Sequence, residues 1–327
     1  DLKLSLFVPM GGATCVAAIQ SAAMAVASGV CNNVLIAVGR TGYSGARVST
    51  RLQQFPQFAL AAEFEAPIGI FAPAQLYAPG ARRHMELYGT TARHFAEVAV
   101  VTRQHAILNG NVVMNKPLTV EDHHASRMIS DPFRLFDCSL ESDGGAAIVL
   151  VNDTYRRNHP TARPLARIDG WGHRTVGLGL QQKLTHSAGD PYVLPHVRRA
   201  ALDAFERAQV GLDQLDGVEV HDCFTPSEYL AIDHLGLTGP GESWKAIENG
   251  DIEIGGRLPV NPSGGLIGGG HPVGASGVRM LLDAAKQVSG TAGAYQVEGA
   301  KTFGTLNFGG STATTVSFVI GSAREAS

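Results

Sequence analysis

Apolar positions along this chain fall into two kinds of run, one typical of buried helices and one typical of buried strands. Residues 13–28 are rich in Ala and apolar around most of a helical circumference, which predicts a buried helix. Residues 33–39 form a short continuous apolar run, as expected for a strand covered on both faces. A loop, a buried helix and a buried strand in this order predict a layered α/β fold.

The pattern changes over residues 40–130, where Pro, Gly and Arg interrupt short helical stretches. Residues 91–109 predict one long helix. Thr119, with Asp122 three residues later, resembles a capping box that begins another helix. We interpret 40–130 as an excursion from the sheet that either covers a site or forms an oligomer contact.

The end of this first region predicts a hairpin followed by a linker. Residues 136–152 contain two strand-like runs on either side of Ser-Asp-Gly-Gly at 142–145, which is a tight-turn signal. Residues 152–166 are polar and contain two prolines, as linkers often do. We therefore predict two halves, 1–152 and 153–327.

The second half alternates in the same way. Its predicted elements are a helix over 195–209, a strand over Gly217–Val220, a helix that begins at Thr225, a Gly-rich loop over 263–277 that leads into a helix, and a hairpin over 301–321 with its turn at Gly309 and Gly310. The two predicted hairpins, each closing its half, indicate an internal duplication.

Charge and composition exclude several classes of protein. The 26 Lys and Arg against 29 Asp and Glu give a net charge of −3, which argues against a basic nucleic-acid binder. No run of about 18 apolar residues occurs, so we expect no membrane-spanning helix. The four cysteines include no C-x-x-C pair, so we expect no zinc or other metal site and a reducing, cytoplasmic location.

Two of the twelve histidines occupy positions where ligands commonly bind. His221 follows the predicted strand Gly217–Val220, and His271 lies in the Gly-rich loop before a helix. Ligands of layered α/β proteins bind at the carboxyl ends of strands, where helix N-termini stabilise negative charge. An imidazole there can donate to an oxyanion or move a proton. One such histidine is more often structural, whereas two at equivalent junctions indicate a site.

Other signals of chemistry are weaker. The loop over 263–277 is neither a Walker A loop nor G-x-G-x-x-G, and no G-x-S-x-G occurs. Cys15 lies in the first turn of the predicted helix 13–28, where a helix N-terminus can activate a thiol. The competing interpretation is a small core residue, as cysteines in Ala-rich helices usually are.

Three sequence blocks follow one another in the second half: HDCFTPSE at 221–228, NPSGG at 261–265 and GHPVGASG at 270–277. Together they resemble the thiolase superfamily, in particular the sterol-carrier-type and lipid-transfer-protein thiolases. The resemblance implies two βαβαβαββ halves related by a pseudo-twofold axis. These halves would form an α/β/α/β/α layered arrangement with an inserted loop domain.

The resemblance also implies roles for individual residues. The position of the family's nucleophilic cysteine falls on Gly12 rather than on Cys15, and the second and third active-site loops correspond to His221 and His271. In the fourth loop, Leu306 stands where the family has Cys or His. The remaining implied site residues are Gly309 and Gly310 as oxyanion turn amides, and Gly12, Ser263 and Asn307 as substrate-binding positions.

Thiolytic cleavage needs a thiolate that holds the acyl group covalently, and a glycine at that position cannot do so. The histidines and amides could still polarise a thioester carbonyl and stabilise an enolate, which suits making or breaking a C–C bond by retro-aldol or Claisen-type chemistry. Some cysteine-free members of the family are aldolases that act on steroid side chains. Two alternatives remain open: a non-catalytic acyl-CoA or lipid-binding subunit, and an acyltransferase of the acetyl-CoA acetyltransferase type that uses Cys15.

The resemblance further implies a role in lipid metabolism, with a coenzyme A thioester as substrate and no permanently bound cofactor. It implies a homodimer and allows an additional OB-fold partner protein. Full thiolases have two strands and two helices before the first active-site loop, whereas ten residues precede Gly11 here. We therefore expect sequence to be missing at the start, because a truncated sheet would expose an edge.

Overall fold

Two separate β-sheets form the framework of the protein. The computed structural model describes residues 2–6, 8, 11–52, 58–59, 61–70, 72–159 and 166–323. In the larger sheet, the strand order is β5-β8-β7-β6. Only β6 and β7 of this sheet run parallel to each other; the other neighbours are antiparallel. The strands are β5 (Ala166–Thr175), β6 (Gly217–Val220), β7 (Thr302–Gly309) and β8 (Thr314–Ser322).

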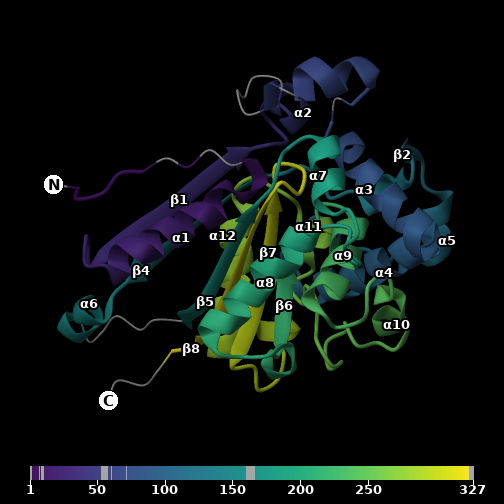
Figure 1. Ribbon diagram of the computed structural model, residues 1–327. Coiled ribbons are helices and arrows are strands. Elements are labelled where there is room, and N and C mark those ends of the chain that lie inside the picture. Colours follow the sequence, from purple (N-terminus) through teal and green to yellow (C-terminus); the bar gives the residue numbers. More distant parts are fainter. Residues whose placement is uncertain are drawn as a thin grey trace.

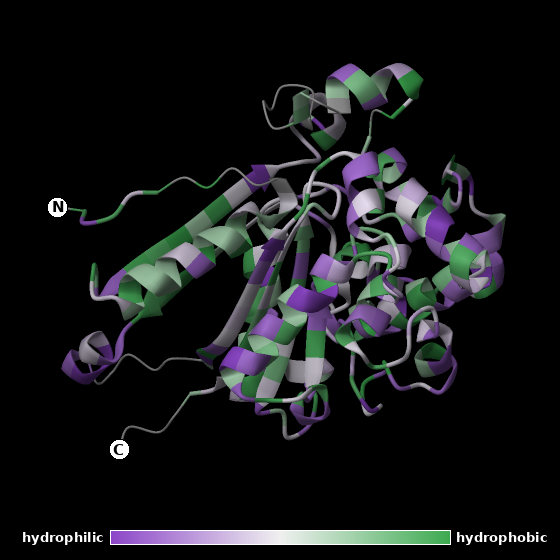
Figure 2. Ribbon diagram, viewed as in Figure 1, coloured by the Kyte–Doolittle hydropathy of each residue, from purple (hydrophilic) through white to green (hydrophobic). Residues whose placement is uncertain are grey.

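The smaller sheet pairs β1 (Asn33–Thr41) with β4 (Asp143–Val151) in antiparallel register. Helices α1 (Thr14–Ala27) and α12 (Ser276–Ser289) pack between the two sheets, and α12 contacts both of them (Figure 1). Figure 2 shows hydrophobic residues along much of β1 and α1. The prediction that this strand is covered on both faces is wrong, because the helices cover only its inner face: Ile36 is buried, whereas Leu35 on the outer face is exposed.

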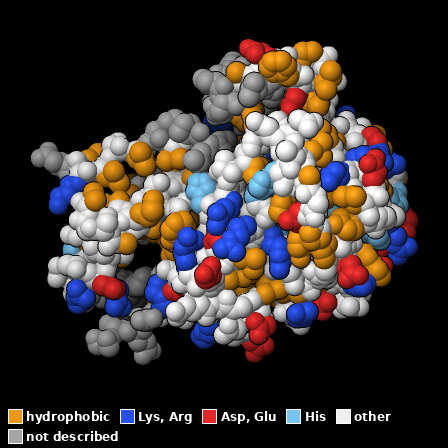
Figure 3. Space-filling model, in the orientation of Figure 1, with side chains coloured by type: hydrophobic (Ala, Val, Ile, Leu, Met, Phe, Trp, Pro, Cys, Tyr) orange, Lys and Arg blue, Asp and Glu red, His pale blue; other side chains and the backbone are white. Residues whose placement is uncertain are grey.

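Helix α8 (Pro195–Ala208) covers the outer face of the larger sheet, where it contacts β5 and β8. Lys and Arg side chains gather over this helix on the surface seen in Figure 3. Two of the arginines, Arg174 and Arg199, pair with Asp203 at 2.6 and 3.0 Å. The helix is therefore amphipathic, with an apolar face on the sheet and a charged face toward solvent.

The chain between β1 and β4 leaves the sheets and forms a helical region beside α9 (Thr225–Leu235). Its long helix is α4 (Ala92–Asn109), as the sequence predicts, and it packs on α9. Thr119 caps α5 as predicted, since its side chain accepts a hydrogen bond from the amide of Asp122. The other elements of this region are α2 (Val48–Leu52), α3 (Pro73–Tyr88), α5 (Val120–Ala125) and a short β2–β3 pair (Met128–Ser130, Phe133–Arg134).

The predicted hairpin over 136–152 is wrong. Only β4 forms there, and its partner is β1, with Val149 opposite Leu35. The Gly-Gly pair lies inside β4 instead of in a turn. A Cβ on Gly144 would lie 2.9 Å from Cγ of Pro272, so this glycine permits close packing of the Gly-His-Pro loop. The proposed duplication loses the support of this hairpin.

The C-terminal hairpin is confirmed, because β7 and β8 pair antiparallel along their length. Its connecting turn has three consecutive residues with positive φ: Gly310 at 57°, Ser311 at 53° and Thr312 at 69°. Short helices complete the second half: α6 (Asp153–Asn158) within the predicted linker, α7 (Leu180–His186), α10 (Ser243–Glu248) and α11 (Gly265–Gly269). Among the described residues, no helix has the length and apolar character needed to cross a bilayer.

Candidate active site

The structure brings His221 and His271 together. The two rings lie 5.1 Å apart between centroids, at an interplanar angle of 81°. His221 follows β6 directly, and its amide donates to the carbonyl of Leu306 on β7 at 2.9 Å. His271 ends the Gly-rich loop, and its amide donates to the carbonyl of Leu140 at 2.8 Å. The backbone therefore fixes each ring independently.

His221 is almost fully buried and is held by the side chain of Asn307. Nδ2 of Asn307 donates to Nδ1 of His221 at 3.1 Å, which places the ring proton on Nε2. Burial, aided by the positive charge of Arg279, lowers the pKa of His221 to about 3. The ring is therefore neutral at pH 7, and its Nε2–H can donate to a ligand. Asn307 thus supports a site histidine, in addition to the substrate contact predicted for it.

His271 has a similar environment. Its Nδ1 lies 2.7 Å from the hydroxyl oxygen of Ser276 in the first turn of α12. Burial lowers its pKa well below the usual value, with smaller contributions from His221 and Arg279. Nε2 of this ring has no hydrogen-bond partner in the described part of the chain, so a substrate atom can use it.

Gly12 lies beside this pair, in the turn that precedes α1. A Cβ placed on Gly12 would lie 3.9 Å from Cε1 of His221 and 3.2 Å from the carbonyl oxygen of Phe308. The end of β7 approaches this turn closely, since a Cβ on Gly309 would lie 2.3 Å from the amide nitrogen of Ala13. A side chain at position 12 would therefore face the histidines, and glycine leaves that place without a nucleophile.

Cys15 lies in the apolar core. It belongs to a buried apolar cluster with Val16 and Ile19 of the same helix, and burial raises the pKa of its thiol to about 11. The helix N-terminus therefore does not activate it. Burial also raises the pKa of Cys138 and Cys223 to about 12. None of these three thiols is ionised at neutral pH.

The hydroxyl of Ser263 is fully buried and donates to Oε2 of Glu219 at 2.7 Å. Its substrate-binding role stays a prediction. Leu306 is also fully buried, in the main hydrophobic core, and reaches the site through its carbonyl only. Gly310 lies in the β7–β8 turn, next to Gly309.

Sequence reasoning missed a set of buried acidic residues behind the histidines. Asp222 accepts hydrogen bonds from the amides of Leu266 (2.7 Å) and Ile267 (3.1 Å), and so caps α11 and orients the loop that leads to His271. A Cβ on Gly265, where φ is +56°, would lie 2.2 Å from this carboxylate. Burial raises the pKa of Asp222 to about 6.

Glu228 belongs to the same set. It accepts a hydrogen bond from Nδ2 of Asn261 at 2.6 Å, and Oδ1 of Asn261 accepts from the amide of Val220 at 2.7 Å. These residues lie in the blocks HDCFTPSE and NPSGG, and Glu228 of the first block binds Asn261 of the second. The two blocks were therefore the sequence signal for this network. The helix predicted to begin at Thr225 is confirmed, because Thr225 is the first residue of α9, and its hydroxyl donates to Asp137. No group of three His, Cys, Asp or Glu side chains within the described ranges could hold a metal ion.

Comparisons with known proteins agree with this architecture. A family described as thiolase C-terminal domain-like matches residues 178–322. An acetyl-CoA acetyltransferase of Methanothermobacter thermautotrophicus is 37% identical over 299 residues, covering 91% of this chain and 74% of the relative. A steroid side-chain-cleaving aldolase of Thermomonospora curvata is 34% identical over 298 residues, covering 89% and 74%.

A third relative, sterol carrier protein 2 of Bos taurus, is 32% identical over 235 residues, which span 69% of this chain and 41% of that protein. The solved structure of an aldolase named Ltp2-ChsH2(DUF35) superposes with a TM-score of 0.83 at 32% identity. It covers 97% of this chain and 79% of that one. The chain belongs to the thiolase superfamily, in the sterol-carrier-type branch.

The chain is therefore an enzyme of this superfamily, and the α/β fold class predicted from the sequence is confirmed.

Proposed function

We propose that this protein is an acyl-CoA lyase that cleaves a C–C bond of a β-hydroxyacyl-CoA by a retro-aldol reaction, without an acyl-enzyme. The observation that carries this proposal is the pair of neutral imidazoles, 5.1 Å apart, beside Gly12, the position that the resemblance assigns to the family's nucleophile. Such a site has donors for an oxyanion, and it has no cysteine at the position of the family's nucleophile.

In the proposed reaction, the thioester oxygen accepts hydrogen bonds from Nε2–H of His221 and from the turn amides at Gly309 and Gly310. Nε2 of His271 accepts the proton of the β-hydroxyl group. The bond between the α and β carbons then breaks, which forms a carbonyl compound and the enolate of a shorter acyl-CoA. His271 returns its proton to the α carbon, so atoms and charge balance without a further reactant.

The thiols of this chain argue against thiolysis. A thiolase needs a thiolate to accept the acyl group. Cys15 is buried in the core with a raised pKa of about 11, and a thiol with that pKa is almost entirely protonated at pH 7. The relatives include both an acetyltransferase and an aldolase, and the site of this chain favours the aldolase reaction.

We further propose that the protein acts as a dimer or with a partner protein, as the two-component name of the solved aldolase suggests. The outer face of the smaller sheet supports an additional contact. Leu35 and Val149 are paired across β1 and β4, and their exposed fractions are 65% and 60%. Large apolar side chains on an uncovered sheet face are typical of interaction surfaces.

Product analysis tests the reaction. A β-hydroxyacyl-CoA is incubated with the enzyme in the presence and absence of free coenzyme A, and both carbon products are quantified. A retro-aldol cleavage gives equal yields in both samples. Cleavage that occurs only for β-ketoacyl-CoA, and only with free coenzyme A, would show a thiolase. Tight binding measured by calorimetry, with no product from an active preparation, would show a carrier instead.

A further inference from the structure

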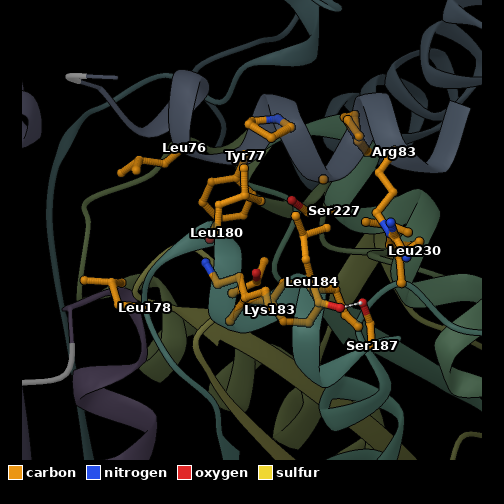
Figure 4. A pocket seen from close by; sticks show the side chains of 18 of the residues that line it. Leu76, Tyr77, Arg83, Leu178, Leu180, Lys183, Leu184, Ser187, Ser227 and Leu230 are labelled. Atoms are coloured by element: carbon orange, nitrogen blue, oxygen red, sulfur yellow. Dashed lines mark hydrogen bonds between the residues drawn. The ribbon is translucent and has the colours of Figure 1, made fainter. Parts of the chain in front are cut away.

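A cavity is lined in part by Phe308, whose ring lies beside His221. It lies between α3, α7 and α9 and encloses about 60 Å³. Figure 4 shows Tyr77 of α3 and Lys183 of α7 on opposite walls, with Leu180 and Leu184 beside the lysine. Most of the lining is apolar. Since a water-sized sphere needs ~10–15 Å³ in this measure, the space suits a group of about four to six non-hydrogen atoms.

The cavity shares a wall with the candidate active site. Phe308 lines it, and the ring centroid of Phe308 lies 6.3 Å from that of His221. At the next turn, Leu178 of the lining has its Cδ1 3.6 Å from the place of a Cβ on Gly310. Phe308 therefore adjoins both His221 and this space, and an acyl group whose thioester carbonyl lies at the histidines would extend past Phe308 to enter it.

Three charged residues line the cavity, and two of them are cations. Nζ of Lys183 donates to the carbonyl of Ser311, which uses one of its three N–H donors. Nε of Arg83 is buried and has no hydrogen-bond partner among the described residues. The one carboxylate, Glu65, accepts a hydrogen bond from the amide of Leu180 at 3.2 Å. Among the charged side chains of the lining, cations therefore outnumber carboxylates.

Desolvation supports the same conclusion. An ammonium group in an apolar cavity loses hydration that it recovers only from a protein acceptor or a ligand. Burial lowers the pKa of Lys183 to about 8, although Glu65 opposes this change. At pH 7 the amine is still mostly protonated and can pair with an anion.

We infer that this cavity binds the distal part of a short acyl group that ends in a carboxylate, and that Lys183 selects for this carboxylate. The inference rests on the proposed function only in assuming an acyl-CoA ligand whose thioester lies at His221 and His271. The specificity arises because a carboxylate compensates the desolvated ammonium, whereas a methyl terminus leaves it without a further partner.

Binding of two matched, uncleavable thioesters tests the inference. Hexanoyl-CoA and adipoyl-CoA differ only in the terminal methyl or carboxylate, and neither has a β-hydroxyl group to react. We expect the wild-type protein to bind adipoyl-CoA at least tenfold more tightly at pH 7, measured by titration calorimetry. Lys183→Met should reduce this ratio to about one, and Lys183→Gln is a second neutral variant should the first fold poorly.

Lys245→Met is the matched control, because Lys245 pairs with Glu242 on the surface and does not line the cavity. This variant should retain the wild-type ratio. A wild-type ratio near one, or a tenfold preference that persists in folded Lys183→Met, would overturn the inference. The outcome is independent of cleavage: a preference for adipoyl-CoA in a protein that forms no retro-aldol products would contradict the proposed function and leave this inference standing.

Discussion

The loop before α1 and the loops that carry the histidines meet at the candidate active site but contribute different chemistry. His221 and His271 bring two neutral imidazoles, whereas Gly12 brings no side chain at all. Cys15, only three residues after Gly12, is buried in the apolar core. The difference teaches that a thiol near a helix N-terminus is functional only when its side chain reaches the site. Chemistry at the candidate active site therefore depends on the second half of the chain, which supplies both histidines.

Replacement of His271 tests whether the paired histidines carry out the proposed cleavage. We expect His271→Ala to lower kcat for retro-aldol cleavage by about 10²–10⁴-fold, because a positioned proton acceptor is lost. The matched control is His124→Ala, since the side chain of His124 is exposed. Steady-state kinetics on folded protein measures both variants. Equal kcat in His271→Ala and wild type would remove His271 from the mechanism.

A cysteine introduced at position 12 tests whether Gly12 stands where the family has its nucleophile. Gly12→Cys places sulfur near Cε1 of His221, so we expect acyl-CoA to acylate the new cysteine and release free coenzyme A. Gly12→Ala is the control, because it adds the same carbon against the carbonyl of Phe308 without a nucleophile. Intact-mass measurement after incubation detects the adduct. If folded Gly12→Cys forms none, Gly12 does not occupy the nucleophile's position.

The buried acidic residues make a smaller but measurable contribution. In Asp222→Asn, one oxygen replaces the two that cap α11, so we expect the free energy of unfolding to fall by about 1–3 kcal/mol. Urea unfolding measures the change, with the exposed Asp213→Asn as control. We also expect a lower kcat, because the loop that leads to His271 loses its anchor. Unchanged stability would show that the cap is dispensable.

Acidification tests the electrostatic state of the two rings. Because burial lowers the pKa of His221 to about 3 and that of His271 well below the usual value, each ring binds a proton only at low pH. Both rings should remain neutral as the pH falls through ~6.5, where the histidines of the unfolded chain take up protons that these two rings in the folded chain do not. Stability contributed by these rings is therefore lost as pH falls below about 6.5. Imidazole NMR signals of either residue that titrate near pH 6.5 in the folded protein would contradict this assignment.

The sequence predicted α4 and the β7–β8 hairpin correctly, whereas the hairpin that it predicted over 136–152 is wrong. Helix α4 and the β7–β8 hairpin have strong local signals in their caps and alternation, and both formed as expected. The Gly-Gly pair at 144–145 carries the same signal as a turn, but its function is to let Pro272 pack against β4, which depends on a contact distant in sequence. Local pattern cannot reveal such a contact.

The same limit applies to the site. The positions of His221 and His271 at strand and loop ends predicted that they meet, whereas the hydroxyl of Ser263 turned to Glu219. Acidic residues in a sequence are ordinarily assigned to solvent, so Asp222 and Glu228 were overlooked although they lie in the recognised blocks. Their burial follows from partners supplied by other segments, such as Asn261 and the amides of α11.

The mass of the intact protein during turnover tests the central claim most directly. The wild-type enzyme is mixed with a β-hydroxyacyl-CoA, quenched at intervals within one turnover, and examined by mass spectrometry while the carbonyl product is quantified. We predict that product accumulates while the protein mass stays unchanged, because no cysteine holds the acyl group. An adduct of acyl mass that forms and decays at the rate of product release, above all on Cys15, would contradict catalysis by the paired histidines alone.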